Sequence, residues 1–421
     1  MSVDSGAIRV VKFGGTSLAD ADLVAAAAQK VVSLADGGYS VVVVVSAQGG
    51  TTNELLSAAR AIARKPSARE VDQLLITGEA ASAALLAMAV DARGRAATSL
   101  VGVQTGIRAQ GRHGWGRMAE IDRRRIDVLL HKGHVVVVAG FHGVTFKEEV
   151  LTLGRGGSDT AAVGLAAALG ASDCEIYTDV DGVFTADPHL VPAARLLAGV
   201  SAEVMVEMSY AGARVLHPRA VDLALRHCID IHVRNSLRPS TGTTVFSGLR
   251  KGIQGMIEDS GAVVGVAHDR AKARVIVWNR PSSLDCTPEF LGALAEESIE
   301  IDVVVRQGSS ESGFELDFVV SLDQLDAVFE AAAELGLETT SDRNIATVSL
   351  VGTRMLERPG ILSRSLSSLR SSRIEVKSFS VAQNRISLIV PEEHSGSAVN
   401  VLHRSMGLAS RRDCSGSEVN V

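Results

Sequence analysis

The sequence predicts an α/β protein, with a mostly parallel open sheet between helix layers followed by two ferredoxin-like βαββαβ units. Two patterns indicate this fold class. Up to about residue 246, short Val- and Ile-rich runs alternate with Ala-rich stretches of helical period, which is typical of parallel strands covered by helices on both faces. Beyond residue 255, one order of strands and helices occurs twice, offset by roughly seventy residues, as in an internal repeat.

The first part of the chain alternates strands and helices. Runs such as 41–45 and 135–138 are continuously apolar, the form that parallel strands take when both of their faces are buried. Strands are expected at 8–13, 40–45, 134–140, 175–178 and 230–234. Ala-rich stretches with helical period predict helices at 20–35, 69–93, 159–169 and 215–227.

A domain boundary is predicted between 238 and 255, where the composition shifts to Pro, Ser, Thr and Gly. Residues 1–250 are expected to form one domain, and residues 262–340 and 341–421 are expected to form the two repeated units. An exchange of strands between the two repeated units is compatible with this pattern. The first repeat is expected to follow the order 273–278, 288–297, 300–307, 313–320 and 322–335, as strand, helix, strand, strand and helix. The second follows the same order over 345–351, 360–371, 374–381, 385–390 and 397–406.

Length and charge exclude several classes of protein. A chain of 421 residues is too long for one ordinary core, and 46% hydrophobic residues with only 4% aromatics indicate a core of Ala, Val, Leu and Ile. The 42 basic and 48 acidic residues give a net charge of −6. A nucleic-acid partner is therefore not expected.

The cysteines and the apolar runs predict a reduced, cytoplasmic protein without a membrane segment. No CxxC or His/Cys ligand spacing is present, so neither a disulfide framework nor a zinc site is expected. The first six residues carry no basic region, and the run 41–45 is far too short to span a bilayer. The cysteines lie far apart, at Cys174, Cys228, Cys286 and Cys414.

A glycine pair follows the first expected strand. Residues 11–17 read VKFGGTS, so Lys12 ends the strand and Gly14 and Gly15 open the following turn. Paired glycines let backbone N–H groups approach an anion, and the lysine adds a positive charge. The motif resembles a phosphate site, although an ordinary strand-to-helix turn remains the alternative because the lysine precedes the glycines, unlike in a Walker A loop.

A second motif is more specific. Residues 153–160 read LGRGGSDT, in which Ser158 is expected to cap a helix and Asp159 to lie in its first turn. A capped helix explains these two residues, but it does not require an arginine between glycines. Arg155 on such a loop is suited to bidentate binding of a carboxylate.

Two further groups of acids are candidates for a site. Residues 177–184 read YTDVDGVF and follow an expected strand, where α/β sheets bind ligands, so their acids could hold a ribose or a metal. A simple Asp-Gly turn is the alternative. Glu79 follows Gly78 in an apolar helical run, where a buried carboxylate requires a cationic partner such as a substrate ammonium.

Taken in order, these motifs resemble those of the aspartokinases, in the amino-acid kinase superfamily. The resemblance rests on VKFGGTS (11–17), VVSA (44–47), TGE (77–79), AGF (139–141), LGRGGSDT (153–160), TDVDGVF (178–184), DP (187–188), GARVLHP (212–218) and GT (242–243). Residues 265–269, GVAHD, and the two repeats look like the paired ACT domains of that family. The resemblance spans nearly the whole chain.

The resemblance implies an amino-acid-kinase fold and the reaction of ATP with L-aspartate to give ADP and 4-phospho-L-aspartate, with Mg²⁺ on the nucleotide. This is the first step toward lysine, threonine and methionine. It assigns catalysis to Lys12 and Asp159. Aspartate would be bound by Ser46, Thr52, Glu79, Arg155 and Ser158. Nucleotide would be bound by Lys12, Gly14, Gly15, Ser17, Thr178, Asp179, Phe184, Asp187, His189 and Arg214.

Several positions depart from the pattern of the family. His189 stands where Arg is frequent and Arg214 where Lys is frequent, so ATP affinity is expected to be weaker. The segment 283–288 has no glycine before its helix, and 353–357 replaces a glycine-rich approach. Since the effector pockets of the family form at these segments, feedback by lysine or threonine is expected to be reduced or altered.

Two other functions remain open, together with the state of assembly. A sibling kinase could phosphorylate another carboxylate, such as glutamate or an N-acylated amino acid, and a protein that kept the fold without turnover could sense amino acids. Retention of Lys12, Glu79, Arg155, Asp159 and Asp179 argues against the second. A homo-oligomer is expected because the repeats expose sheet edges, or a hetero-oligomer if a shorter subunit begins near Met256.

Overall fold

The computed structural model describes residues 7–248, 262–278, 285–309 and 313–409. Among these, one compact unit comprises 7–183, 196–209 and 214–248. A second unit comprises 184–195, 210–213 and the described residues from 262 onward. The expected starting point of a shorter subunit, Met256, and part of the glycine-poor segment 283–288 lie outside the described residues.

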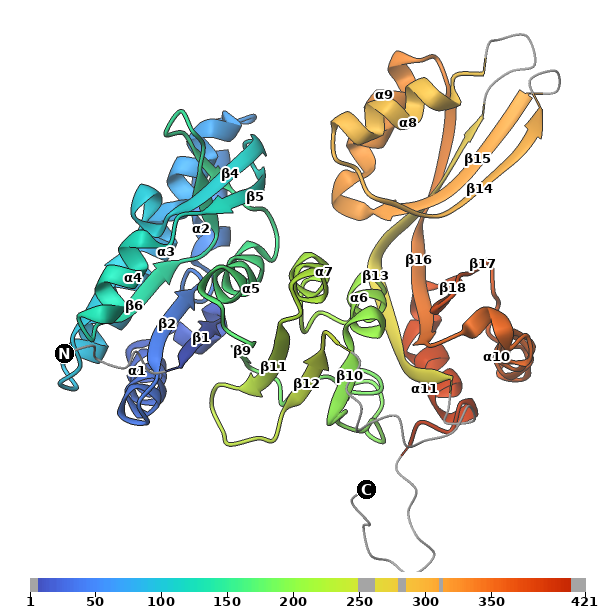
Figure 1. Ribbon diagram of the computed structural model, residues 1–421. Coiled ribbons are helices and arrows are strands. Elements are labelled where there is room, and N and C mark those ends of the chain that lie inside the picture. The colour runs from blue at the N-terminus through green and yellow to red at the C-terminus, as the bar shows by residue number, and fades with distance from the viewer. Residues whose placement is uncertain (1–6, 249–261, 279–284, 310–312, 410–421) are drawn as a thin grey trace, which may run out of the picture. The chain divides into compact units, whose positions relative to one another are not determined.

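An eight-stranded sheet forms the centre of the first unit, in the order β10-β12-β11-β9-β1-β2-β6-β3 (Figure 1). Strands β11, β9, β1, β2, β6 and β3 run parallel, as the apolar runs predict. Their carboxyl ends therefore meet along one edge of the sheet. The bounds are β1 Ile8–Phe13, β2 Ser40–Val45, β3 Ala97–Leu100, β6 Val135–Ala139, β9 Asp173–Thr178, β10 Gly199–Ser201, β11 Asp230–Asn235 and β12 Thr243–Phe246.

Helices cover this sheet because alternate strand residues face opposite sides. Val11, Val43 and Val137 belong to one buried cluster with residues of α1 (Ala21–Asp36) and α3 (Ala68–Asp91). The opposite face packs against α5 (Gly157–Leu169), of which eleven residues are buried. The remaining helices of this unit are α2 Thr51–Ile62, α4 Arg124–His131, α6 Ala202–Tyr210, α7 Pro218–His227, η1 Gly15–Leu18 and η2 Gly102–Thr105.

Helix α3 is, by length and composition, the one candidate membrane span among the described residues. It is a core helix here, since Ala83, Leu86 and Val90 are fully buried in the cluster that α3 shares with α1 and the sheet. The same helix buries two carboxylates, Asp72 and Glu79, which lie two turns apart on one face.

A second, four-stranded sheet lies beside the main one in this unit, in the order β5-β4-β7-β8. Its hairpin of β4 (Ile107–Arg112) and β5 (Trp115–Ile121) was not expected from the sequence, because polar residues and glycines interrupt the apolar residues of these strands. Strands β7 (His142–Val144) and β8 (Val150–Thr152) complete it and lead into the LGRGGSDT motif.

The second unit is built on a six-stranded antiparallel sheet, in the order β14-β15-β13-β16-β18-β17 (Figure 1). Strands β13 (Val263–Trp278) and β16 (Glu338–Gly352) pair along most of their length, and β13 takes part in two hydrophobic clusters. The remaining elements are β14 Ile301–Ser309, β15 Gly313–Ser321, β17 Ser378–Val381, β18 Arg385–Pro391, α8 Thr287–Glu296, α9 Leu325–Glu334, α10 Gly360–Ser371, α11 Ser395–Ser405, η3 Leu322–Gln324, η4 Met355–Glu357 and η5 Glu392–His394.

These two clusters mark the repeated units. One contains Val275 and Val277 of β13 with α8 and α9, and the other contains Val263 and Val266 of the same strand with α10 and α11. The first residues of β13 therefore pack with the second repeat, which is an exchange of strand between repeats. In the second repeat, the expected strand 374–381 was too long, because only Ser378–Val381 pairs with β18.

One segment from the middle of the chain also belongs to the second unit. Residues 184–195 bury Ala186 and Val191 in the cluster of the second repeat. The buried Thr185 hydroxyl bonds to His403 Nε2 at 2.9 Å, and its carbonyl accepts a hydrogen bond from the Val266 N–H at 2.8 Å. We did not expect this from the sequence, which assigned the whole of 1–250 to one domain.

Candidate active site

The lysine of the first strand is paired with an acid of the second motif. Lys12 Nζ lies 2.6 Å from Asp159 Oδ1, and each side chain is only 12% exposed. Lys12 comes from β1 and Asp159 from the first turn of α5, so the contact joins the two motifs across the carboxyl edge of the sheet. A cation held by one carboxylate keeps donors free for an anion such as a phosphoryl group.

The turn after Lys12 packs closely against the segment that follows β2. A Cβ at Gly15 would lie 2.4 Å from the Ala47 carbonyl oxygen, so no side chain fits at position 15. A Cβ at Gly14 would lie 3.6 Å from Lys12 Nζ. The Ser17 hydroxyl is buried and has no hydrogen-bond partner. A buried hydroxyl without a partner is costly, and a phosphate oxygen would satisfy it.

Glu79 is fully buried beside this pair. Its Oε1 accepts a hydrogen bond from Ser158 Oγ at 3.0 Å, and its Oε2 accepts one from the Phe141 N–H at 2.5 Å. Burial raises the pKa of the Glu79 carboxyl to about 7, although these hydrogen bonds and the charge of Lys12 act in the opposite direction. A substrate ammonium would favour its charged form.

The expected cap role of Ser158 is wrong. Helix α5 begins at Gly157, and Gly156, with φ of +69°, holds the cap position without a side-chain hydrogen bond. Ser158 lies inside the first turn and donates to Glu79 instead. Gly154 and Gly156 both have left-handed φ values, so the helix begins only after them and Arg155 lies in an exposed loop ahead of it.

The other expected aspartate contacts lie near the same edge. Ser46 follows β2, and its N–H donates to the Phe13 carbonyl at 3.2 Å. Thr52 lies in the first turn of α2, where helix N–H groups are free of intrahelical partners. A Cβ at Gly78 would lie 3.1 Å from Thr51 and 3.2 Å from Ala47, so the glycine before Glu79 allows α3 to approach both segments.

The expected nucleotide residues divide between the two units. Thr178 and Asp179 follow β9 in the first unit, with the Thr178 hydroxyl donating to Asp179 Oδ1 at 3.0 Å, and Arg214 is an exposed residue of this unit. Phe184, Asp187 and His189 belong to the second unit. There, Asp187 Oδ1 accepts a hydrogen bond from the His189 N–H at 2.9 Å, so Asp187 also shapes its own turn.

Sequence reasoning missed two residues at the end of β11. The Ser236 N–H donates to the Thr178 carbonyl at 2.7 Å, and the Ser236 hydroxyl is buried without a partner. Asn235 Nδ2 donates to Asp181 Oδ1 at 2.8 Å, which orders the turn after β9. An Asn-Ser pair closing a parallel strand was the available signal, because such strand ends share the edge of the site.

The oxygen ligands at the end of β9 suit the Mg²⁺ that would accompany a nucleotide. No group of three or more His, Cys, Asp or Glu side chains with metal-binding geometry occurs within the described parts of the chain. Mg²⁺ commonly takes one or two carboxylates and completes its shell with phosphates and water. The exposed Asp179 carboxylate beside the Thr178 hydroxyl suits such a partial set.

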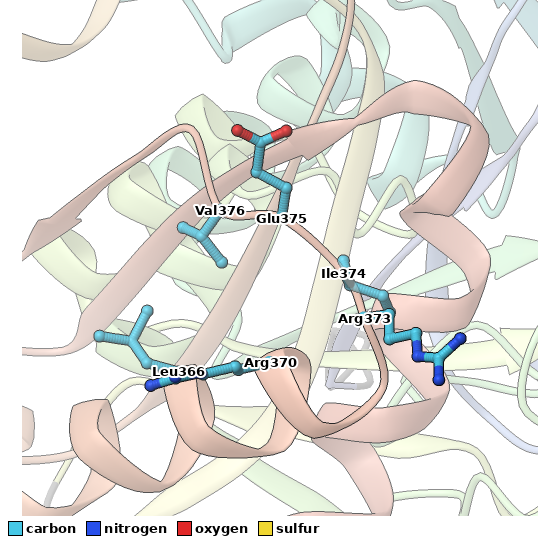
Figure 2. A pocket seen from close by; sticks show the side chains of 6 residues that line it. All are labelled: Leu366, Arg370, Arg373, Ile374, Glu375 and Val376. Atoms are coloured by element: carbon cyan, nitrogen blue, oxygen red, sulfur yellow. The ribbon is translucent and has the colours of Figure 1, made fainter.

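The second unit has a pocket of about 400 Å³ between α10 and the segment that follows it. Figure 2 shows Arg373 and Glu375 pointing in different directions around it, while Leu366 and Val376 supply apolar lining. None of the site residues of the first unit lines this pocket.

The fold and the site together define an amino acid kinase, and residues 7–235 match the model of the amino acid kinase family. Residues 348–406 match an ACT domain. The aspartokinase of Geobacillus stearothermophilus is 40% identical over 403 residues, which cover 96% of this chain and 98% of that protein. The chain belongs to the aspartokinases, and the predicted fold class is confirmed.

Other relatives agree with this assignment. The aspartokinase of Thermus thermophilus is 39% identical over 408 residues, covering 96% of this chain and 99% of that protein. Escherichia coli aspartokinase III in complex with aspartate and ADP has a TM-score of 0.80 and 25% identity, covering 94% of this chain and 99% of that one.

Proposed function

We propose that this enzyme transfers the γ-phosphoryl group of ATP to the β-carboxylate of L-aspartate, giving ADP and 4-phospho-L-aspartate. The observation that carries the proposal is the Lys12–Asp159 pair at 2.6 Å, beside a glycine turn on one side and the buried Glu79 on the other. The related aspartokinases, and the homologue solved with aspartate and ADP, support this choice of substrates.

Lys12 would stabilise the charge that develops on the transferred phosphoryl group, since phosphoryl transfer depends mainly on positioning and electrostatics. Asp159 would hold the ammonium of Lys12 in place. No general base is required, because the β-carboxylate of aspartate is already ionised at neutral pH. The Gly15 N–H and the Ser17 hydroxyl would bind the phosphates, and Gly14, whose N–H donates to the Tyr177 carbonyl, would let the backbone approach them.

The amino acid would be oriented by opposite charges. Arg155 would bind the α-carboxylate and Glu79 the ammonium, with Ser46, Thr52 and Ser158 as polar neighbours, which leaves the β-carboxylate facing ATP. Thr178, Asp179 and Arg214 of the first unit would hold the nucleotide further, and Asp179 would help to hold Mg²⁺, which would neutralise charge on the phosphates. Phe184, Asp187 and His189 of the second unit remain nucleotide contacts predicted from the sequence.

Trapping with hydroxylamine tests the reaction. An acyl phosphate reacts with hydroxylamine to give a coloured hydroxamate, so purified enzyme with ATP, Mg²⁺ and L-aspartate is expected to form aspartyl hydroxamate. Parallel reactions with glutamate and an N-acetylated amino acid are expected to give none. Product from another acceptor alone would support a sibling kinase, and no product from any acceptor would support a sensor without turnover.

We propose further that ACT-bound effectors act weakly on this enzyme. Helix α8 begins at Thr287 and is preceded by a segment without glycine, and residues 353–357 include Arg354 in the left-handed region with φ of +52°. Lysine and threonine, singly and together, are expected to leave more than half of the activity. Strong inhibition by either one at low concentration would contradict this.

We also propose that the enzyme is an oligomer that assembles through the second unit. Strands β14 and β17 are the edges of the six-stranded sheet, and edges favour pairing with another sheet. A homo-oligomer or an assembly with a shorter subunit would satisfy them. Mass spectrometry of natively expressed protein would show whether one polypeptide or two is present.

A further inference from the structure

A fully buried acid that the proposed mechanism does not use lies on α3, two turns before Glu79. Asp72 has a side chain that is 0% exposed. Its carboxylate accepts hydrogen bonds from the Thr152 hydroxyl at 2.6 Å, the Gly114 N–H at 3.0 Å and His113 Nδ1 at 3.0 Å. It therefore ties the tip of the β4–β5 hairpin to the end of β8, immediately before the loop that carries Arg155.

An arginine from α7 holds the same two segments. Arg219 donates through Nη1 to the Leu153 carbonyl and through Nη2 to the Gly116 carbonyl, the latter at 3.1 Å. Its guanidinium also lies over the Trp115 ring, 5.6 Å from the centroid. Only a planar fork of donors can bridge two carbonyls and stack on a ring at the same time.

The Arg155 loop is enclosed on both sides as a result. A Cβ at Gly154 would lie 3.2 Å from the Trp115 ring, and one at Gly156 would lie 2.0 Å from the His217 ring. His217 precedes α7 by one residue, and its Nδ1 accepts a hydrogen bond from the Arg219 N–H. Arg155 thus extends from a backbone whose neighbours are set by side chains of α7 and the hairpin.

We propose that Arg219 is a positioning residue for the amino-acid substrate. By fixing the Leu153 carbonyl against the hairpin, it sets the backbone from which Arg155 reaches the α-carboxylate of aspartate. This inference rests on the proposed function. The glycine turn after β1, which we propose binds the nucleotide, is held by contacts that do not involve Arg219. The Gly14 N–H donates to the Tyr177 carbonyl, and the Gly49 N–H donates to the Gly15 carbonyl. Loss of Arg219 therefore affects aspartate and not ATP.

The test is steady-state kinetics of Arg219→Met, which keeps the bulk of the side chain and removes its donors. The KM for aspartate is expected to rise roughly tenfold to a hundredfold, because a displacement of about 1 Å is enough for such losses. The KM for ATP is expected to stay within about twofold. With aspartate α-amide, which lacks the α-carboxylate, the variant and the wild type are expected to differ by less than about threefold.

Three further variants complete the design. Arg226→Met removes an exposed arginine of the same helix that pairs with Asp222, and wild-type kinetics are expected. Arg219→Lys keeps the charge but cannot bridge both carbonyls, so an intermediate KM for aspartate is expected. Trp115→Phe keeps an aromatic surface and is expected to raise the KM for aspartate less than Arg219→Met does.

The outcomes separate this inference from the function on which it rests. Equal rises in both KM values, no change in either, or the same loss with aspartate α-amide would overturn the positioning role. If Arg219→Met shows no cooperative thermal unfolding, the kinetics of Arg219→Lys decide by the same criteria. Failure of the wild type to form aspartyl hydroxamate counts against the proposed function instead.

Discussion

Replacing Lys12 with methionine is expected to lower kcat by about a thousandfold, because it removes the ammonium that we propose stabilises charge on the transferred phosphoryl group. Lys12 Nζ lies 2.6 Å from Asp159 in a mostly buried pair. Coupled ADP release and hydroxamate formation would measure the loss. A variant with a kcat within about tenfold of the wild type would remove Lys12 from the chemistry.

The Lys12 experiment requires a control for folding. Methionine leaves the Asp159 carboxylate without its partner, which costs about 3–5 kcal/mol for a buried pair. The double variant Lys12→Met with Asp159→Asn removes both charges, so it is expected to be more stable than the single variant while remaining inactive. Lys132→Met, at the exposed end of α4, serves as the matched surface control. Thermal unfolding followed by circular dichroism separates loss of fold from loss of chemistry.

A change of Glu79 to glutamine is expected to remove most of the pH dependence of aspartate binding. Burial raises the Glu79 pKa to about 7, so the carboxyl is neutral below that pH and cannot attract the ammonium of aspartate. The wild-type KM for aspartate should therefore rise as the pH falls from 8 to 6, by up to about tenfold per unit. In Glu79→Gln the KM should be about a hundredfold higher at pH 8 and nearly independent of pH.

The raised pKa of Glu79 also makes the stability of the folded protein depend on pH. The direction of this dependence follows from which state, folded or unfolded, binds the proton. Between the ordinary value of 4.5 and about 7, the folded protein keeps a proton on Glu79 that the unfolded chain releases. Stability therefore falls as the pH rises through this window, by about 3 kcal/mol when complete. Urea unfolding at pH 5 and pH 8 should show this slope in the wild type and lose it in Glu79→Gln.

Glu70→Gln is the control for both measurements, since Glu70 is an exposed acid at the start of the same helix. It should keep the pH profile of the wild type. A pH-independent KM for aspartate in the wild type, or an unchanged profile in Glu79→Gln, would show that Glu79 does not bind the ammonium.

The main elements of the first unit could be predicted because its strands are apolar on both faces. The expected strands 8–13 and 40–45 coincide with β1 and β2. The site motifs were also visible, because LGRGGSDT places an arginine between glycines, which a capped helix does not require. The pairing of Lys12 with Asp159 could not be predicted, because the two residues lie more than a hundred positions apart in the sequence. The same holds for Ser158 and Glu79, which are 79 positions apart.

Other features could not be predicted for physical reasons. The β4–β5 hairpin mixes apolar residues with charged residues and glycines, and much of it is exposed, so no regular apolar alternation marks its strands. Expected strands 273–278 and 345–351 captured only parts of β13 and β16. The first residues of β13 pack in the cluster of the other repeat, and residues 338–344 of β16 are polar and largely exposed, so neither stretch shows the pattern of a buried strand. The role of Arg219 was missed because its partners are backbone carbonyls, which every residue carries.

The segment 184–195 has a consequence for how the gene can be divided. A fragment ending near residue 250 would retain Ala186 and Val191, which are 4% and 3% exposed in the full chain, without the residues around 398–408 that cover them. The buried Thr185 hydroxyl would also lose His403. The kinase half is thus no independent module, because part of its own polypeptide completes the core of the regulatory half.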